Sequence, residues 1–284
     1  GLGSLTGAAD SGTYWSNFFF DKDGIVDKYV DYVLEDLTKH VDKLIVVCNG
    51  QLNERGRKTF EKFTGNIIVR ENKGFDVWAY KTAIDSEGWN KLIEYDEIIL
   101  MNYTIMGPVY PLKEMFDIMD KRLELDFWGI TKCFQENSPV AQQIWQCPYG
   151  YIPEHIQSSF MAFRRSIVSS TIFQKYWDEM PMIKSYYESG GSHEQYITKY
   201  FSDNGYRWDC YTNYDDMDEE IYTCCPLIVA PLEVIKNRKS PFFKRRTFFS
   251  MKTDYSQTLP VAKEFLDFLE KETSYDTALI YSNL

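Results

Sequence analysis

Apolar and polar positions alternate in blocks along the first half of the chain. Short apolar runs, typical of buried strands, occupy residues 15–20, 44–48, 67–69, 97–101 and 126–130. Helical segments separate these runs, over residues 25–37, 52–63, from Val77 onward, and over 111–119. Because strand and helix alternate with short connections, the pattern predicts an α/β fold. We expect a mostly parallel, Rossmann-type sheet with helices on both faces.

The second half of the chain is less regular. Residues 132–154 are predicted to form a long irregular insertion, and Ser189–Ser192 a glycine-rich loop. Helices are expected over residues 167–177, 193–201 and 260–272. We expect residues 1–13 to be a flexible tail or a cloning remnant and residues 14–250 to form one α/β domain. Residues 251–284 are expected to form a helical extension packed on that domain.

Composition excludes several functional classes. The chain has 31 basic and 42 acidic residues, a net charge of -11, and so lacks the basic footprint of a nucleic-acid-binding protein. No apolar run reaches the length of about 18 residues that a membrane span needs. The six cysteines and three histidines form neither a C-x-x-C pair nor a close cluster, which argues against a zinc site. Free thiols indicate the reducing cytosol, so a cytoplasmic location is expected.

Polar residues follow the predicted strands at the points where ligands bind in open parallel sheets. These candidate ligand-binding residues are Asp21, Asn49, Asn72, Gly74, Asp76, Asn102 and Thr104. The chain contains no P-loop, no G-x-G-x-x-G and no G-x-S-x-G, so the sequence does not predict an ATPase, a dinucleotide site or that type of hydrolase.

Several of these residues also have a purely structural interpretation. Asn72-Lys73-Gly74 is a turn signal in which glycine supplies a positive φ, and Asn49-Gly50 is another. Asp76 is equally well placed to cap a helix that begins at Val77. Core packing is expected for at least one of Trp78 and Tyr80.

Six segments, in order along the chain, resemble the rhamnan synthesis protein F family. They are ENKGFDVWAYK, LMNYTIMGPVYPLKEMF, DFWGITK, HIQSSFMAFRRSI, HEQYITKYFSDNGYRWD and KSPFFKRRTFF, and the resemblance extends from about Phe18 to Phe249. Proteins of this family are bacterial glycosyltransferases that build rhamnose-containing cell-wall polysaccharides. The resemblance implies a GT-A-like fold for residues 14–250. It also implies inverting transfer of L-rhamnose from dTDP-L-rhamnose to a glycan or lipid-linked acceptor.

The resemblance also implies how the donor is held. GT-A enzymes of this kind carry an N-x-G segment after the third strand, which Asn72-Lys73-Gly74 matches. Where they place a metal-binding D-x-D, this chain has Asn102-Tyr103-Thr104. Neutral oxygens bind hard cations weakly, so we expect no required metal, with Mn²⁺ or Mg²⁺ as the alternative. Cations of the segment Lys244, Arg245 and Arg246 are then expected to bind the donor diphosphate.

The catalytic role is assigned to Glu194, which matches the family position of an active-site acid. We expect it in the first turn of a helix capped by Ser192, acting as general base on the acceptor hydroxyl. A simple first-turn charge is the alternative. His155 and His193 are candidates for contact with the acceptor or a phosphate, against a structural or exposed role.

Two further questions stay open at this stage. The basic, phenylalanine-containing segment 236–246 suits a diphosphate, a peripheral contact with the inner face of the cell membrane, or solvent. The expected partners are a nucleotide sugar and a glycan or glycolipid acceptor. The competing functions are transfer from a UDP-hexose and binding of a nucleotide sugar or glycan without turnover.

Overall fold

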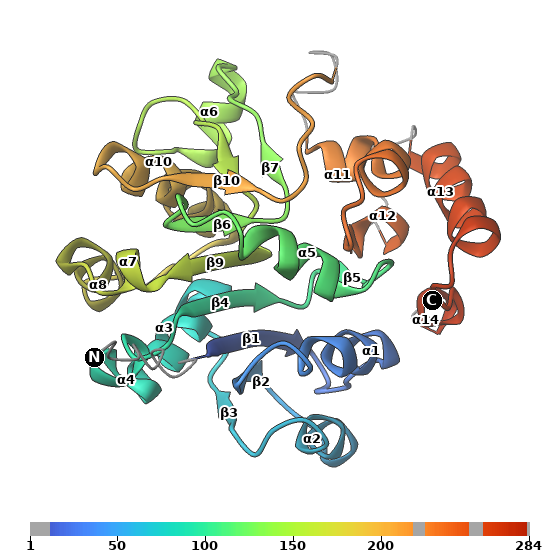
Figure 1. Ribbon diagram of the computed structural model, residues 1–284, viewed down its shortest axis with the longest axis horizontal. Coiled ribbons are helices and arrows are strands. Elements are labelled where there is room, and N and C mark those ends of the chain that lie inside the picture. Colours follow the sequence, from blue (N-terminus) through green and yellow to red (C-terminus); the bar gives the residue numbers. More distant parts are fainter. Residues whose placement is uncertain (1–11, 218–224, 250–257, 283–284) are drawn as a thin grey trace, which may run out of the picture.

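The computed structural model describes residues 12–217, 225–249 and 258–282 (Figure 1). Most of the expected tail, residues 1–11, lies outside this range, and the first strand already begins at Thr13. The described residues form a seven-stranded sheet in the order β3-β2-β1-β4-β9-β6-β10. Its strands are β1 (Thr13–Asp21), β2 (Lys43–Gly50), β3 (Ile67–Arg70), β4 (Glu97–Asn102), β6 (Phe127–Gly129), β9 (Phe160–Arg164) and β10 (Trp208–Cys210).

The sheet is parallel except at one strand. β1 pairs in parallel with β2 and β4, β2 with β3, and β6 with β10, whereas β9 runs antiparallel between β4 and β6. The predicted mostly parallel α/β fold is therefore confirmed, although the sequence pattern did not indicate the reversed strand. Two small antiparallel ladders lie outside the sheet, β5 (Ile105–Met106) with β11 (Phe243–Lys244) and β7 (Lys132–Cys133) with β8 (His155–Ile156).

Helices connect these strands. The first seven are α1 (Lys28–Leu37), α2 (Glu54–Glu61), α3 (Phe75–Glu87), α4 (Trp89–Leu92), α5 (Leu112–Met119), α6 (Pro139–Trp145) and α7 (Arg165–Val168). The others are α8 (Thr171–Asp178), α9 (Tyr186–Glu188), α10 (Gln195–Asp203), α11 (Pro226–Val229), α12 (Arg246–Phe249), α13 (Thr258–Glu272) and α14 (Ala278–Tyr281). The described residues also contain two π-helical turns, η1 (Ser189–Glu194) and η3 (Glu233–Asn237).

Two apolar cores cover the two faces of the sheet. Successive side chains of a strand point to opposite faces, so β1 sends Trp15 and Phe19 into one core and Tyr14 and Phe18 into the other. The first core includes residues of α1, α2, α5 and α13. The second includes residues of α3, α8 and α10, among them the fully buried Tyr80, which confirms the expected core packing.

The last two helices lie at one margin of the molecule (Figure 1). Phe265 of α13 packs edge-on against Phe243 of β11, with 5.2 Å between ring centroids. Tyr275, just after α13, meets Tyr32 of α1 at 5.5 Å. These contacts join α13 to the first core and to the ladder that carries Lys244.

Two local expectations are wrong. The insertion 132–154 is not irregular throughout, because it contains β7 and helix α6. The expected glycine-rich loop at Ser189–Ser192 is part of the π-helical turn η1, which joins α9 to α10. The two glycines mislead because they normally mark loops; here a Cβ on Gly190 would lie 2.3 Å from the Trp145 ring and one on Gly191 only 1.8 Å from the Trp145 carbonyl oxygen.

Candidate functional site

The predicted ligand-binding residues at the carboxyl ends of β3 and β4, and just beyond them, meet at one edge of the sheet. Because β1 to β4 are parallel, their carboxyl ends, at Asp21, Gly50, Arg70 and Asn102, lie on the same side. The Asn102 amide donates a hydrogen bond of 3.3 Å to the Asp76 carboxylate, which lies in the first turn of α3. The strand-end argument therefore placed these two residues correctly beside each other.

The turn between β3 and α3 is held by Asn49 and Arg70. The Asn49 amide donates to the Phe75 carbonyl at 3.0 Å, and Arg70 donates to the Asn49 side-chain oxygen at 2.7 Å and to the Lys73 carbonyl at 2.8 Å. Phe75 has φ 56°, a left-handed conformation that a non-glycine residue adopts only when its surroundings hold it there. Both polar groups of Asn49 are used in this support and its side chain is buried, so Asn49 shapes the turn from beneath.

Gly74 is the N-cap of α3, so the expected capping role of Asp76 for a helix beginning at Val77 is wrong. The φ of Gly74 is 79°, and a Cβ there would come within 2.4 Å of the Trp78 side chain. Two physical requirements, a left-handed backbone and room for an indole, therefore explain this glycine.

We predict that Gly74→Ala lowers the free energy of unfolding by about 1–2 kcal/mol, because the new methyl group adds steric overlap to a strained φ. Urea denaturation measures this change. Gly88 also has a positive φ, 80°, but has open space around it, and Gly65 has open space without a positive φ. We expect the loss to be largest for Gly74→Ala, smaller for Gly88→Ala and smallest for Gly65→Ala. Equal losses at Gly74 and Gly88 would contradict the steric explanation.

The segment Asn102-Tyr103-Thr104 meets the basic segment through a short ladder. The Asn102 side-chain oxygen accepts hydrogen bonds from the Thr104 amide, at 3.0 Å, and from its hydroxyl, at 2.6 Å. Just beyond, β5 pairs with β11, and the Arg245 amide donates to the Thr104 carbonyl at 2.9 Å. This places the Lys244 ammonium 3.4 Å from the Thr104 hydroxyl. Two predicted binding elements, about 140 residues apart in the chain, are thus adjacent.

The last three cations of the basic segment, Lys244, Arg245 and Arg246, extend in different directions. Lys244 lies close enough to Glu194 to help lower the pKa of that carboxyl. Burial raises the pKa of the Tyr186 hydroxyl, and the exposed Arg246 lies close enough to oppose that shift. Arg245 instead lies over the ring of Tyr29, with its guanidinium carbon 5.9 Å from the ring centroid. Lys244 is therefore the cation of the three that the structure places near Glu194, and Arg246 lies beside Tyr186.

The first part of the basic segment forms ion pairs. Lys236 pairs with Glu272 at 3.0 Å, and Arg238 pairs with Glu233 at 3.1 Å and with Asp216. These acids offset the charge that an interaction with an anionic membrane would use.

Glu194 lies at the end of η1, where the π-helical turn meets α10. The backbone amide of Ser158 donates to its carboxylate at 2.8 Å, and the Ser158 hydroxyl donates to the same oxygen. The expected cap at Ser192 is wrong, because the helical segment begins earlier, with Ser185 accepting from the Glu188 amide at 3.1 Å. π-Turns of this kind are frequent at functional sites, since they redirect one side chain out of helical register.

Asp76 and Glu194 form a pair of carboxylates with opposite pKa shifts. Burial and the negative charge of Glu194 raise the pKa of Asp76 to about 6. Burial alone would also raise the pKa of Glu194, but His155, Lys244 and the Ser158 hydrogen bonds outweigh it, so this pKa lies below its ordinary value. Near neutral pH, Glu194 is therefore an anion, whereas Asp76 holds its proton up to a higher pH than an ordinary aspartate does.

The two candidate histidines have different surroundings. His155 is 3% exposed, and its Nδ1 lies 2.7 Å from the Pro153 carbonyl, which can only accept, so Nδ1 carries the hydrogen and Nε2 remains available. His193 is 2% exposed and lies 2.8 Å from the Tyr176 hydroxyl. Burial lowers the pKa of His193 to about 4, so its imidazole is neutral at neutral pH. The structure thus places His155 beside Glu194 and His193 within aromatic packing.

The other donor-binding candidates lie at the same edge. The Asp21 carboxylate accepts from the amides of Asp23 and Ile25, both at 2.9 Å, and so closes its own turn. Asn72 is exposed within the turn between β3 and α3. Phe75 exposes 37% of its surface there, and it was not among the predicted site residues.

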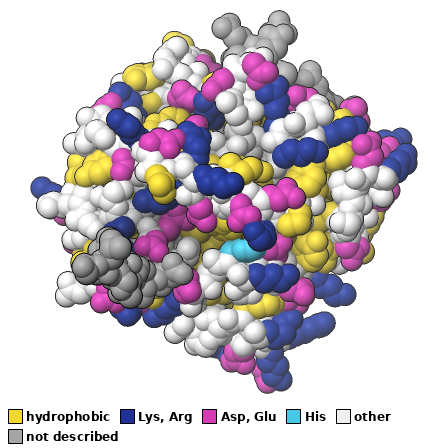
Figure 2. Space-filling model, in the orientation of Figure 1, with side chains coloured by type: hydrophobic (Ala, Val, Ile, Leu, Met, Phe, Trp, Pro, Cys, Tyr) yellow, Lys and Arg dark blue, Asp and Glu magenta, His cyan; other side chains and the backbone are white. Residues whose placement is uncertain are grey.

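Within the described ranges, no group of three or more His, Cys, Asp or Glu side chains is arranged to hold a metal ion. In the same ranges, no helix combines the length and apolar character needed to cross a bilayer. Basic and acidic side chains are intermingled over the face drawn in Figure 2 rather than gathered by sign.

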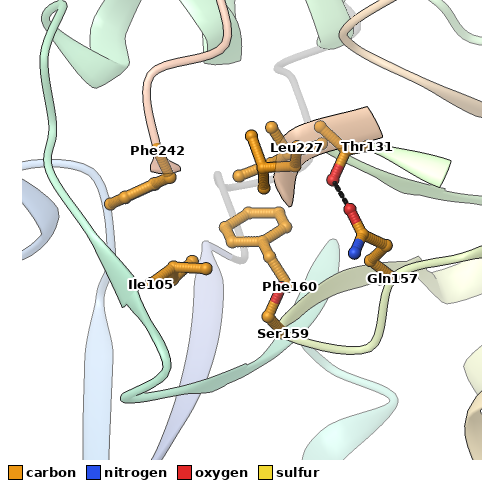
Figure 3. Close-up of a pocket in the computed structure, with 8 residues that line it drawn as sticks. Ile105, Thr131, Gln157, Ser159, Phe160, Leu227 and Phe242 are labelled. Atoms are coloured by element: carbon orange, nitrogen blue, oxygen red, sulfur yellow. Dashed lines mark hydrogen bonds between the residues drawn. The ribbon is translucent and has the colours of Figure 1, made fainter. Parts of the chain in front are cut away.

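One small cavity lies beside this edge, and one larger hollow lies away from it. The cavity in Figure 3, about 10 Å³ and lined by Phe160, Phe242 and Leu227 among others, holds at most one water and is a packing gap. A hollow of about 360 Å³ adjoins Thr13 and Glu97, where β1 and β4 begin, so it lies at the opposite edge of the sheet. The Glu97 carboxylate is bound by Arg164 and Trp128, both at 2.8 Å. The carboxyl edge remains the better candidate site.

Comparison with known proteins gives a family. The family model of rhamnan synthesis protein F matches residues 44–284, which confirms the resemblance of the six segments. An uncharacterized protein, y4gN, of Sinorhizobium fredii (strain NBRC 101917 / NGR234) is 23% identical over 150 residues, which are 52% of this chain. The aligned part is 35% of that relative, so the chain spans about a third of its length.

Solved structures with a similar arrangement are distant in sequence. A cytidylyltransferase from Leptospira borgpetersenii is 15% identical, with a TM-score of 0.41 over 93% of this chain and 99% of that one. Glucosyl-3-phosphoglycerate synthase from Mycobacterium tuberculosis, in complex with Mn²⁺, UDP-glucose and phosphoglyceric acid, is 11% identical. It gives a TM-score of 0.31 over 54% of this chain and 57% of that one.

Proposed function

The chain belongs to the rhamnan synthesis protein F family, and on that premise we propose that it is an inverting glycosyltransferase. The donor is dTDP-L-rhamnose, and the acceptor is a glycan or a lipid-linked glycan of a surface polysaccharide. Family membership supports sugar transfer in general. The rhamnosyl donor, the acceptor and a location at the inner face of the cell membrane are parts of the proposal.

One observation carries this proposal. Two carboxylates with opposite pKa shifts, Asp76 and Glu194, lie at the carboxyl edge of the sheet with the ammonium of Lys244 close to Glu194. A transferase of this type needs an anionic base for the acceptor and a cation for the departing diphosphate. Both requirements are met within one cluster, built from segments that are far apart in the sequence.

The reaction assigns a role to each group. The acceptor hydroxyl attacks the anomeric carbon from the side opposite the diphosphate, and its proton passes to the Glu194 carboxylate. The bond between the anomeric carbon and the diphosphate oxygen breaks, and the configuration inverts. Lys244 and Arg246 stabilise the negative charge that develops on the diphosphate. Asn72, Asn102 and Asp76 bind the donor, and Asn49 and Gly74 hold the turn in shape.

We infer metal-independent transfer from the side-chain oxygens of Asn102 and Thr104, which are poor ligands for a divalent cation. The Asn102 side-chain oxygen already accepts two hydrogen bonds from Thr104, and both residues are neutral. A divalent cation prefers carboxylate oxygens, which this segment lacks. We therefore assign charge neutralisation to the cations of the basic segment, with Mn²⁺ or Mg²⁺ as the alternative.

A thermal-shift titration tests the donor and the metal together. We expect dTDP-L-rhamnose to raise the Tm in proportion to the logarithm of its concentration over Kd, equally in EDTA and in Mn²⁺. UDP-glucose and UDP-galactose are the comparison donors. Stabilisation by a UDP-sugar alone would favour the UDP-hexose alternative, and a requirement for Mn²⁺ would contradict the metal-independent mechanism. Donor binding without transfer to any glycan would indicate a non-catalytic protein.

Lys244→Ala is predicted to raise the Kd for dTDP-L-rhamnose about 10-fold, because it removes a charge-assisted contact with the diphosphate. Isothermal titration calorimetry measures this. Lys22, whose side chain is 85% exposed just after β1, supplies the control. Lys22→Ala makes the same change in net charge at the same edge and should leave the Kd unchanged. If both variants bound the donor like the wild type, Lys244 would have no role in donor binding.

A further inference from the structure

Helix α6, in the insertion after β7, has no buried residue. Val140 is 65% exposed and Ile144 48% exposed, one helical turn apart on the same side. A helix without a fully buried residue is not explained by core packing alone. Its sequence, PVAQQIW, contains apolar and amide side chains and no charge.

Trp145, the last residue of α6, packs this helix against the π-helical turn η1, which carries the proposed base Glu194. The space that side chains would fill at Gly190 and Gly191 is occupied by the ring and the carbonyl oxygen of Trp145. Because the two glycines of η1 have no side chains, Trp145 can pack directly against this turn. Glu194 is the last residue of the same turn. The position of α6 is therefore coupled to the position of the proposed base.

Two tyrosines of α9 extend the aromatic surface. Tyr186 and Tyr187 are each 54% exposed, and their ring centroids lie 5.7 and 5.5 Å from that of Trp145. The two tyrosine rings are 5.7 Å apart and nearly perpendicular, at 73°. We call the group Trp145, Tyr186 and Tyr187 the aromatic shelf.

The aromatic shelf adjoins the charged cluster. The Tyr186 hydroxyl lies close enough to Arg246, Glu194 and Asp76 for the charges of all three to act on its pKa. The shelf therefore begins beside a proposed diphosphate cation, at Tyr186 of α9, and continues to Trp145 of α6. A molecule lying on the shelf would have one end within reach of the proposed base.

We propose that the aromatic shelf is the acceptor subsite, and that it binds a pyranose ring of a glycan by stacking. This inference rests on the proposed function. Flat aromatic rings bury the C–H face of a sugar, while hydroxyl and amide groups at their edges bind its hydroxyls. Neither α6 nor α9 carries a Lys or Arg, so these helices do not present the positive charge that would attract an anionic membrane. The chemistry of this surface therefore favours a neutral glycan over a lipid headgroup.

Binding of soluble rhamnose oligosaccharides of one to six units tests this subsite. Isothermal titration calorimetry should show a Kd that decreases with chain length, and Tyr187→Ala should raise the Kd for the longer oligosaccharides about 5- to 10-fold. Tyr187→Phe should retain most of the affinity, since it keeps the ring. The control is Tyr281→Ala, which removes a tyrosine of similar exposure, 49%, from α14.

The controls separate failure of the subsite from failure of the proposed function. Donor-induced stabilisation by dTDP-L-rhamnose should be the same in the wild type and in Tyr187→Ala. If the donor binds but the oligosaccharide Kd is the same in wild type, Tyr187→Ala and Tyr281→Ala, the shelf is not the acceptor subsite. Binding to phosphatidylglycerol vesicles that Tyr187→Ala abolishes, without oligosaccharide binding, would also overturn the proposal. If dTDP-L-rhamnose itself does not bind, the proposed function fails.

Discussion

Glu194→Gln is expected to reduce the rate of sugar transfer about 1,000-fold while leaving donor binding in place. The amide is nearly isosteric with the carboxylate, and its oxygen can still accept the hydrogen bonds from Ser158. It cannot take up the acceptor proton, however, so only the chemical step loses its base. Radiolabelled transfer from dTDP-L-rhamnose to a rhamnose oligosaccharide measures the rate, and the thermal shift with donor measures binding.

A matched variant controls for the loss of charge near the site. Glu188 lies in the same helical segment as Glu194, six residues earlier, and accepts a hydrogen bond of 2.8 Å from the Lys184 amide. Glu188→Gln should transfer sugar at close to the wild-type rate. If Glu194→Gln retained more than about a tenth of the wild-type rate, general-base catalysis by this residue would be excluded, because such a base contributes about 100-fold or more.

Glu194→Gln should also change the pKa of the neighbouring Asp76. The negative charge of Glu194 is one of the causes of the raised pKa of Asp76. In Glu194→Gln we expect the pKa of Asp76 to fall toward its ordinary value, though burial still holds it above that value. An NMR titration of the Asp76 carboxyl carbon would show this coupling independently of any activity measurement.

The fold could be predicted because its information is local. Continuous apolar runs such as residues 44–48 indicate strands buried on both faces, and those strands are parallel in the structure. The reversed direction of β9 could not be predicted in this way. A buried apolar run such as Phe160–Phe163 has the same pattern in either direction, and direction depends on where the connecting segments lead.

The candidate site was predicted in part for a similar reason. The strand-end rule needs only the order of elements, so it identified Asn102 and Asp76. The contact of Lys244 with Thr104 depends on the β5–β11 ladder, whose strands are too short to give a periodic signal. Ser158 was missed because a serine that donates to a carboxylate looks, in sequence, like any other serine. Its position inside the segment HIQSSFMAFRRSI was the only available signal.

Asp76→Asn is expected to stabilise the folded protein at neutral pH and to lower its sugar-transfer activity. The folded-state pKa of Asp76 is about 6, above the ordinary value of 3.8. Between these two values the folded chain holds a proton that the unfolded chain has lost, so this group makes stability fall as the pH rises from about 4 to 6. Removing the charge should therefore raise the free energy of unfolding at pH 7 by about 2–3 kcal/mol. The Tm should rise by about 5 °C.

The pH dependence of the increase in unfolding free energy shows whether the raised pKa of Asp76 is its cause, as opposed to a general effect of removing one negative charge. The stability difference between Asp76→Asn and the wild type should be near zero below about pH 4 and reach its full value above about pH 6. Asp23, whose side chain is 61% exposed at the same edge, supplies the matched control, and Asp23→Asn should show no such rise. Urea denaturation across this pH range measures both variants.

The activity of Asp76→Asn shows whether this carboxylate also binds the donor. If this carboxylate binds the donor, its loss should lower kcat/KM about 10-fold even though the protein becomes more stable. A residue retained at a cost in stability is expected at a functional site and has no explanation in a purely structural one. A variant that was both more stable and fully active would show that Asp76 has no role in transfer. A variant with unchanged stability across this pH range would show that its environment does not disfavour the charge.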